Sequence, residues 1–414
     1  MQISVTSVSL ALVLLYSCGS CSSTNNTGAS DTGTVTTASE APVETRQPGS
    51  NYKPAFEGQT RIQGIKTKAG YGFTVVTSDL KRPWSIKVMD DGRFLVTEKE
   101  GKMRIVSASG QIGEPISGVP QVNSSGQGGL LDVVTDPDFK NNRMIYWTFS
   151  EDVQGGNLTS VAKAKLSTDD KRLENVQVIF RAMPAYQGRL HYGSRILVGK
   201  DGYLYVSTGE RSDLATRPQA QHLNSALGKV IRITKDGKPA PGNPFTGRKD
   251  AMPEIYTYGH RNPQGLAFHP TTGELWLSEM GPKGGDEINR IQAGKNYGWP
   301  TITYGLEYSG KTIGEGITQK EGMEQPVYYW DPVLSPSGMT FYAGNKIAEW
   351  KNNLFICGLN SNHIARLTLK DNRVTGEERL LANEGQRFRD ITEGGDGALY
   401  AVTDEGRLYK IAAK

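Results

Sequence analysis

Four short segments of this 414-residue chain carry side chains that could do chemistry. In the first, Arg189–Arg195, His191 lies among glycines just before an apolar stretch. Histidine is the side chain that exchanges a proton near neutral pH, so His191 is a candidate general base. A structural, hydrogen-bonding histidine is the alternative. The other four histidines are scattered, without the spacing of a metal site.

The second segment, Tyr258–Gly265, holds Arg261 and Asn262 side by side. Arginine offers a planar fork of donors for a carboxylate or quinone oxygen, and asparagine adds both a donor and an acceptor. These two side chains could therefore bind and polarise an oxygen-rich ligand. A capped turn before a strand is the alternative interpretation.

The third segment combines acidic side chains with a glycine-rich loop between Glu279 and Pro300. Calcium prefers carboxylate and carbonyl oxygens, and a glycine-rich loop exposes its carbonyls readily. Asp286 and Glu287 are the candidate carboxylates, although their spacing is not that of an EF-hand. From chemistry alone, a calcium site and a solvated acidic loop are both open.

The fourth segment, Gln386–Asp390, places Arg387 and Arg389 two residues apart. On a strand, side chains at this spacing point to the same face. Two guanidinium groups on one face repel each other unless a negative charge compensates. Either an anionic ligand, or Asp390 and its neighbours, could provide that charge.

A degenerate repeat predicts the elements that position these segments. Each unit reads as an apolar strand, a turn that often contains Asp-Gly, and a second alternating strand, which is a strong hairpin signal. Six such units predict an all-β, six-bladed β-propeller of four-stranded antiparallel blades around a central channel. A pair of β-sandwiches is the alternative fold. The six units span 84–97, 131–147, 195–206, 265–277, 338–356 and 389–402.

Two further strands, 73–76 and 407–411, are expected to complete one shared blade. In a propeller the loops at one end of the channel converge. The four polar segments lie just before or after the repeats, so we expect them to meet at the channel mouth.

Charge and composition exclude some functions. The net charge is only +4 on 90 ionised side chains, and the chain has no Lys/Arg run, which argues against a nucleic-acid partner. Cys357 is expected to be a small buried strand residue.

The N-terminus is predicted to direct export. Residues 1–17 form a signal peptide whose end resembles a bacterial lipoprotein cleavage box, with Cys18 as the lipidated residue and Cys21 as the alternative. Met1–Ser4 lacks the usual Lys or Arg, so an ordinary signal peptide with a freely soluble product is a second interpretation. Residues 18–58 are polar and predicted to be a flexible tether, and 59–414 the propeller domain. The expected location is the periplasm or the outer membrane, with membrane contact only through the lipid anchor.

Several phrases in this order resemble the soluble quinoprotein sugar dehydrogenases, specifically the aldose sugar dehydrogenases. They are Leu190–Arg195, Gly259–Gly265, Asn296–Pro300 and Arg387–Asp390, within a resemblance from about Pro83 to Lys410. The resemblance implies pyrroloquinoline quinone (PQQ) and Ca²⁺ at the channel mouth of a six-bladed propeller.

The resemblance also implies a role for each matched residue. His191 would be the catalytic base, and Arg261 and Asn262 would hold the quinone oxygens. The other implied cofactor contacts are Gln127, Tyr308, Asn360, Arg387 and Arg389. The carbonyls of Gly281 and Pro282 would hold the cofactor's calcium, and Glu287 and Tyr297, with Asp286 nearby, would match a further calcium site.

Three positions depart from this pattern. Met280 stands where relatives often carry His or Gln, and Leu190 stands where glucose-oxidising relatives carry Asp beside the base. Asn360 and Ser361 fall where some relatives place a lysine on the cofactor. None of these departures removes the base or the arginines.

The expected function is therefore PQQ-dependent oxidation of an aldose to its lactone, with hydride transfer to the quinone. The electron acceptor would be a periplasmic cytochrome or a quinone, and the protein a monomer or homodimer. A non-catalytic sugar- or protein-binding propeller is the alternative. A propeller lactonase is less favoured, because no cluster of carboxylate and asparagine metal ligands can be assembled from these segments.

Overall fold

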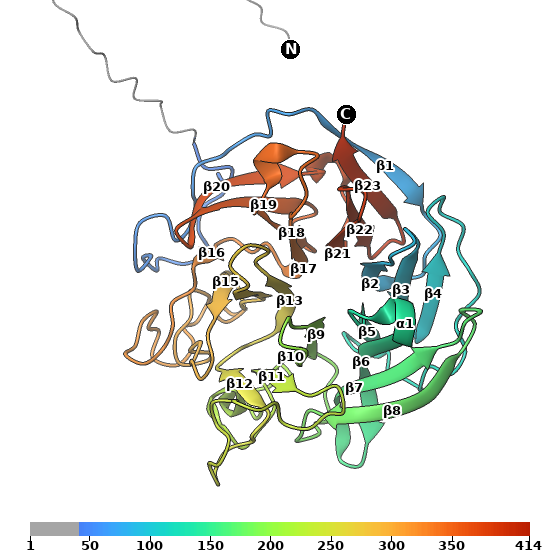
Figure 1. Cartoon of the computed structure of the whole chain (residues 1–414). Coiled ribbons are helices and arrows are strands. Elements are labelled where there is room, and N and C mark those ends of the chain that lie inside the picture. Colours follow the sequence, from blue (N-terminus) through green and yellow to red (C-terminus); the bar gives the residue numbers. More distant parts are fainter. Residues whose placement is uncertain (1–40) are drawn as a thin grey trace, which may run out of the picture. The chain divides into compact units, whose positions relative to one another are not determined.

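The predicted hairpins form the inner parts of six β-sheets. In the computed structural model, which describes residues 41–414, short strands joined by tight turns build sheets that follow one another around a centre (Figure 1). Helix is confined to a few single turns. The fold is thus the predicted all-β, six-bladed β-propeller, which confirms the interpretation of the repeat.

Within the described residues, five sheets have four strands and one has three. All strand pairs within the sheets are antiparallel. In chain order the strands are β1 (Tyr71–Thr77), β2 (Pro83–Val88), β3 (Phe94–Glu98), β4 (Lys102–Val106), β5 (Leu130–Thr135), β6 (Met144–Val153), β7 (Gly156–Leu166), β8 (Leu173–Arg181), β9 (Gly193–Val198), β10 (Leu204–Thr208), β11 (Lys229–Ile233), β12 (Ile255–Tyr258), β13 (Pro263–Phe268), β14 (Leu275–Glu279), β15 (Asp286–Ile291), β16 (Tyr328–Trp330), β17 (Pro336–Phe341), β18 (Leu354–Gly358), β19 (Ile364–Lys370), β20 (Arg373–Leu380), β21 (Phe388–Glu393), β22 (Leu399–Thr403) and β23 (Leu408–Ala413). The helical turns are α1 (Phe139–Asn142), η1 (Arg217–Gln221), η2 (Ala348–Trp350) and η3 (Ala382–Glu384).

The three-stranded blade, β2-β3-β4, is the one departure from the predicted four strands. Its outer position is occupied by an irregular segment that still hydrogen-bonds to β4. Ile112 forms an isolated bridge with Val106, and the amide of Ile116 donates to the carbonyl of Met103. The edge of β4 is therefore partly paired.

The ring is closed by pairing the two ends of the domain. β1 adds to the outer edge of β23, with Thr74 opposite Lys410 and Val75 opposite Tyr409. This confirms the prediction that the strands near 73–76 and 407–411 share a blade. Closure in this way leaves no gap in the ring and uses one sheet edge that would otherwise be open.

The core lies between neighbouring blades. The innermost strands contact one another around the ring in the order β2, β5, β9, β13, β17, β21 and back to β2. The faces of adjacent blades pack large apolar side chains against each other, such as Trp147 on β6 with Leu95 and Met103 of the preceding blade. Cys357 is buried in the same kind of layer, as predicted. This packing holds the strand ends at the channel mouth in place.

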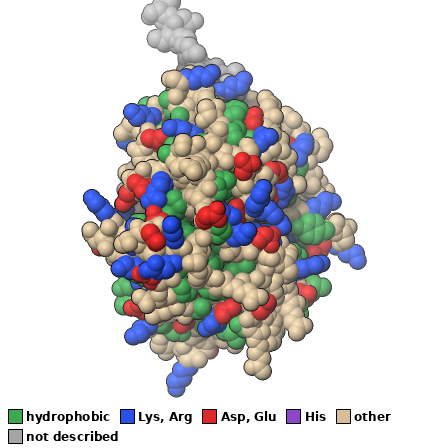
Figure 2. Space-filling model, turned by 90° about the vertical axis from the view of Figure 1, so that its right-hand side faces the viewer, with side chains coloured by type: hydrophobic (Ala, Val, Ile, Leu, Met, Phe, Trp, Pro, Cys, Tyr) green, Lys and Arg blue, Asp and Glu red, His purple; other side chains and the backbone are tan. Residues whose placement is uncertain are grey.

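The outer surface mixes charges of both signs. On the side of the ring shown in Figure 2, Lys and Arg alternate with Asp and Glu, and apolar side chains are scattered among them. Neither sign dominates that face. None of the helices in the described part of the chain has the length and apolarity needed to cross a membrane.

Residues 41–58, placed in the predicted tether, make specific contacts with the propeller. The amides of Gly49 and Ser50 donate to the carboxylate of Asp331, at 2.8 and 2.9 Å. Arg379 on β20 donates to the buried carboxylate of Glu44 at 2.8 Å. Contact with the propeller therefore begins well before residue 59. The predicted signal peptide, Cys18, Cys21 and the tether up to residue 40 lie outside the described residues.

Removing residues 41–58 is expected to destabilise the propeller. Each lost hydrogen bond contributes about 0.5–1.5 kcal/mol, so the free energy of unfolding should fall by about 2–4 kcal/mol. The measurement is the thermal unfolding midpoint of a chain that begins at residue 59, compared with one that begins at residue 41. Equal midpoints would show that these contacts do not stabilise the domain.

Candidate functional site

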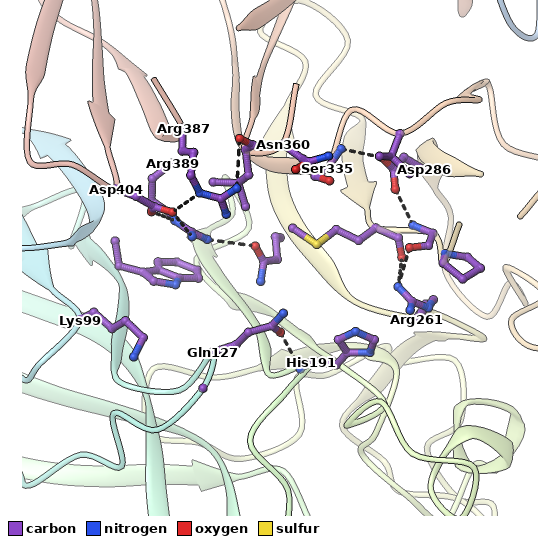
Figure 3. Close-up of a pocket in the computed structure, with 18 of the residues that line it drawn as sticks. Lys99, Gln127, His191, Arg261, Asp286, Ser335, Asn360, Arg387, Arg389 and Asp404 are labelled. Atoms are coloured by element: carbon purple, nitrogen blue, oxygen red, sulfur yellow. Dashed lines mark hydrogen bonds and ion pairs between the residues drawn. The ribbon is translucent and has the colours of Figure 1, made fainter. Parts of the chain in front are cut away.

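A cavity of about 540 Å³ lies where the loops converge, and every blade contributes to its wall. Figure 3 shows polar side chains from several strands pointing into this space. Seven of the eight residues predicted from the resemblance to contact the cofactor or to catalyse line it directly, so the structure brings most of that set together. The lining residues are Arg82, Pro83, Trp84, Lys99, Gly126, Gln127, His191, Arg261, Gln264, Met280, Gly281, Pro282, Lys283, Asp286, Tyr308, Val333, Ser335, Leu359, Asn360, Arg387, Arg389 and Asp404.

His191 is held against a buried carboxylate. It precedes β9 in a left-handed backbone conformation, with a φ of 47°. Its Nδ1 lies 2.6 Å from Oε1 of Glu210, which follows β10 in the same blade and is 1% exposed. A carboxylate can only accept, so Nδ1 carries the proton and Nε2 keeps its lone pair. No described residue hydrogen-bonds Nε2, and His191 lines the cavity.

The electrostatic environment keeps His191 neutral. Burial lowers its pKa to about 4, the positive charge of Arg261 acts in the same direction, and Glu210 only partly opposes them. At neutral pH the imidazole is therefore uncharged and can accept a proton at Nε2. Although Leu190 leaves no carboxylate next to His191 in sequence, Glu210 brings one to the imidazole from the next strand end.

The lowered pKa of His191 also predicts how stability depends on pH. The pKa is about 6.5 in the unfolded chain and about 4 in the folded one, so stability is complete above pH 6.5 and is lost as pH falls toward 4. The loss attributable to this group is about 3 kcal/mol. We expect the His191→Asn variant to lack this pH-dependent loss of stability, because asparagine does not titrate in this range. Asparagine also tolerates the left-handed φ, so the turn can keep its shape. Urea unfolding of the unaltered chain and of His191→Asn at pH 7 and pH 4 gives the free energy of unfolding of each. An equal loss of this free energy in the two proteins between pH 7 and pH 4 would contradict the prediction.

Two predicted cofactor contacts hydrogen-bond the turn that carries His191. Oε1 of Gln127 accepts the amide of His191 at 2.8 Å, and Gln127 also lines the cavity. Asn262 is fully buried and does not line the cavity; its Oδ1 accepts the amide of Gly193 at 3.1 Å. Its amide nitrogen lies 3.7 Å from the sulfur of Met280, a weak acceptor. In this structure Asn262 therefore helps to hold the turn that carries His191.

Arg261 faces the cavity but is already hydrogen-bonded. Its guanidinium donates to the carbonyls of Met280 and Gly281, at 2.9 and 2.6 Å, while its buried Nε has no partner among the residues that the structure describes. The carbonyl of Pro282 accepts no hydrogen bond from any described residue. Calcium ligation by Gly281, as the resemblance implies, would use the second lone pair of a carbonyl that already accepts from this guanidinium.

Arg387 and Arg389 share one carboxylate across the top of the cavity (Figure 3). Asp404 accepts from Arg387 at 3.0 Å and from Arg389 at 2.8 Å. Burial raises the pKa of Asp404, but the charge of Arg389 and the hydrogen bonds of both arginines bring it below its usual range. The pair thus has one negative charge for two positive charges, which leaves a net cation on the cavity wall.

Asp390, offered from the sequence as the compensating charge, belongs to a different cluster, and that interpretation is wrong. Its carboxylate pairs with Arg195 at 2.9 Å below the cavity, where Arg195 also lies 4.3 Å above the ring of Trp84. Burial raises the pKa of Asp390 to about 6. Because side chains alternate along β21, Asp390 points the opposite way from Arg387 and Arg389.

Tyr308 and Asn360 lie at the rim. Tyr308 is 75% exposed, on the loop whose Glu307 pairs with Arg217. Asn360 is exposed beside Leu359, whose carbonyl accepts from Arg387 at 3.3 Å. Both line the cavity, so both are free to contact a ligand from its open side.

Asp286 organises the loop that holds the carbonyls. Its two oxygens accept the amides of Gly281 at 2.8 Å and of Ser335 at 2.6 Å. Burial raises its pKa to about 7. A side chain on Gly281 would meet the carbonyls of Gly284 and Gly285 at 2.4 and 2.3 Å, so only glycine fits this turn. Asp286 therefore ties the loop together.

Glu287 and Tyr297 do not line the main cavity; they line a small neighbouring space that shares Arg261, Met280 and Gly281 with it. Glu279 also lines this space, and Asn289 donates 3.1 Å hydrogen bonds to both glutamates while its own Oδ1 has no partner. Burial and the charge of Glu279 raise the pKa of Glu287 well above its usual value. Among the described residues no group of three or more His, Cys, Asp or Glu is arranged to hold a metal. A cation here would need amide and carbonyl oxygens as well as the two carboxylates.

Comparison with known proteins identifies related chains along nearly the whole domain. The profile of the glucose/sorbosone dehydrogenase family matches residues 80–410. The aldose sugar dehydrogenase YliI of Escherichia coli is 41% identical over 345 residues, which cover 82% of this chain and 92% of that protein.

Solved structures agree with the sequence comparison. A crystal structure of a glucose dehydrogenase has a TM-score of 0.80 and 41% identity, covering 83% of this chain and all of that chain. The PQQ-bound form of an aldose sugar dehydrogenase from Streptomyces coelicolor has a TM-score of 0.69 and 29% identity, covering 84% of this chain and all of that chain.

Proposed function

The chain belongs to the glucose/sorbosone dehydrogenase family, and we propose that it oxidises aldose sugars at the anomeric carbon to the lactone, with PQQ as the cofactor. One observation carries this proposal. A neutral, carboxylate-paired His191 faces a cavity whose opposite wall holds the excess positive charge of Arg387 and Arg389. A base facing an anion-binding wall is the arrangement that oxidation with an anionic cofactor requires.

The residues of the cavity fit PQQ, a planar quinone that bears carboxylates. Arg387 and Arg389 would hold carboxylates, because the one carboxylate that they share, Asp404, leaves positive charge to spare. Trp84 lines the cavity with a flat aromatic side chain. The buried Nε of Arg261 has no acceptor, which an additional oxygen beside it would satisfy. When bound, PQQ supplies the two-electron acceptor that takes the hydride from the sugar.

The chain itself has to hold and move one proton. In the proposed reaction Nε2 of His191 removes the proton from the anomeric hydroxyl as the carbon–hydrogen bond is broken. Glu210 accepts from Nδ1 throughout, so the positive charge that develops on the ring is stabilised where it forms. The neighbouring cation, Arg261, favours the return of the neutral ring.

We propose that calcium binds at two places. The carbonyls of Gly281 and Pro282 would take the ion associated with the cofactor. Glu287, with Glu279 and the unpaired Oδ1 of Asn289 near it, would take a structural ion together with the free carbonyl of Tyr297. The support is chemical, since the close packing of two carboxylates and an orphan oxygen favours a hard cation.

We also propose that the chain is exported and anchored through Cys18, and that it passes electrons to a periplasmic cytochrome or quinone. The support lies in the N-terminal sequence pattern alone. Labelling with a radioactive fatty acid, with Cys18→Ser and Cys21→Ser compared, would test the anchor. If the Cys18→Ser variant took up as much label as the unaltered chain, Cys18 would not be the lipidated residue.

The test of the function is dye reduction by the purified chain with a panel of aldoses. PQQ and calcium are added separately and together, and chelator-treated protein serves as the baseline. Activity that requires PQQ and rises with calcium is the expected result. If the chain bound PQQ by fluorescence titration but oxidised no aldose, the substrate class would be wrong. If it bound none, the non-catalytic binding propeller would be favoured.

A further inference from the structure

Lys99 is a buried cation on the cavity wall that the roles described above do not use. It follows β3 and is 7% exposed, yet it lines the cavity together with Gln127, Arg387 and Arg389. Figure 3 shows its side chain on the side of the cavity that also carries Gln127. A lysine buried to this extent is expected to have a partner of opposite charge.

No described carboxylate provides that partner. The ammonium of Lys99 hydrogen-bonds only to the backbone carbonyl of Ser124, and it forms no ion pair within 4.0 Å among residues 41–414. Arg82 pairs with Glu100, and Asp404 is shared by the two arginines. Two of the three ammonium hydrogens are therefore left for another acceptor.

The backbone around Lys99 is fixed on both sides, so the position of the ammonium is built into the fold. Its amide donates to the carbonyl of Arg82 at 3.0 Å, and its carbonyl accepts the amide of Leu130 at 3.0 Å. A side chain on Gly129 would lie 2.2 Å from the carbonyl of Lys99, so the loop that carries Gln127 has to pass directly against it.

The surrounding charges disfavour an isolated cation at this place. Burial lowers the pKa of Lys99, and the nearby positive charges of Arg82 and Arg389 add to the effect, against a weaker opposing effect of Glu100 and Asp404. A buried charge without an opposite charge beside it is unfavourable for stability. The arrangement is typical of a site that is completed by an anionic ligand.

We propose that Lys99 is a cofactor-binding residue whose ammonium pairs with a carboxylate of bound PQQ, on the wall beside Gln127. This assignment rests on the proposed function. It makes Lys99 the third cation, after Arg387 and Arg389, that recognises the anionic edge of the cofactor, and the one that has no carboxylate partner among residues 41–414.

The test is fluorescence titration of the cofactor-free chain with PQQ at several salt concentrations. Lys99→Met is expected to raise the dissociation constant by about 10- to 100-fold and to weaken its salt dependence. Lys99→Arg should restore most of the affinity. The matched control is Lys102→Met, which removes an exposed lysine of the same blade and should change the affinity by less than about twofold.

The thermal midpoint of the cofactor-free variant separates binding from a structural role. Because Lys99 has no carboxylate partner, Lys99→Met should leave the midpoint unchanged or raise it. A lower midpoint would show that Lys99 stabilises the fold through Ser124, and it would overturn the proposal. An unchanged affinity for PQQ in Lys99→Met, or an equal loss of affinity in Lys102→Met, would also overturn it. If the unaltered chain itself bound no PQQ, the proposed function would fail instead.

Discussion

Replacing His191 with asparagine should lower the turnover number of the cofactor-loaded protein by about 10²- to 10⁴-fold, the usual effect of removing a general base. Nε2 of His191 is the free, neutral nitrogen that faces the cavity, and asparagine has no basic atom to replace it. Asparagine also tolerates the left-handed φ of 47°, so the turn should keep its shape. The affinity for PQQ, which depends on the cations of the wall, should change little.

Two measurements separate this role from a structural one. Steady-state dye reduction with an aldose gives the turnover number, and fluorescence titration gives the affinity for PQQ. The exposed His222 offers a matched control, since His222→Asn should behave like the unaltered chain. Normal turnover in His191→Asn would remove His191 from the mechanism, whereas lost PQQ binding would show that it holds the cofactor.

The propeller could be predicted because its signals are local. Most blades begin with a pair of strands joined by a short turn, and such a turn favours glycine or aspartate at fixed places, as at Asp201-Gly202 between β9 and β10. The same reliance on local signals explains why the sequence did not predict that the fourth, outer strand of the first blade is replaced by an irregular segment. Residues 111–116 follow β4 through scattered hydrogen bonds, and no periodic pattern marks them.

The partners of the site residues could not be predicted from short phrases because they come from other strand ends. Glu210 is 19 residues from His191, and Asp404 is 15 residues from Arg389. One signal in the sequence was available. His260 and Glu279 form the same pair at the same spacing of 19 residues in the next blade, at 2.9 Å. A histidine before the inner strand and a glutamate after the second strand meet because the hairpin register brings them together.

That repetition also explains why only one of the two histidines can act as a base. His260 is fully buried, and its second ring nitrogen lies 2.9 Å from the hydroxyl of Thr257. Both nitrogens of His260 are thus occupied, and its ring stacks on Tyr297. In His191 the second nitrogen is free toward the cavity. The same pair therefore serves stability in one blade and chemistry in the other.

Replacing Glu210 with glutamine should lower turnover by about 10²- to 10⁴-fold, although Glu210 does not touch the substrate. The carboxylate accepts from Nδ1, which leaves the lone pair on Nε2. A glutamine amide can donate to Nδ1 instead, which moves the proton to Nε2 and removes the base. Losing the negative charge should also lower the pKa of His191 further, because Glu210 is the group that raises it.

Glu210 is a positioning residue, so its test has to report on the ring of His191. Nitrogen NMR of ring-labelled protein distinguishes the two tautomers, and the Nδ1-protonated form should dominate in the unaltered chain but not in Glu210→Gln. Glu210→Asp keeps a carboxylate and should recover part of the turnover. If Glu210→Gln lost turnover with its tautomer unchanged, the carboxylate would act through the fold of the 209–228 loop, where its Oε1 also accepts the amide of Ser212 at 3.1 Å.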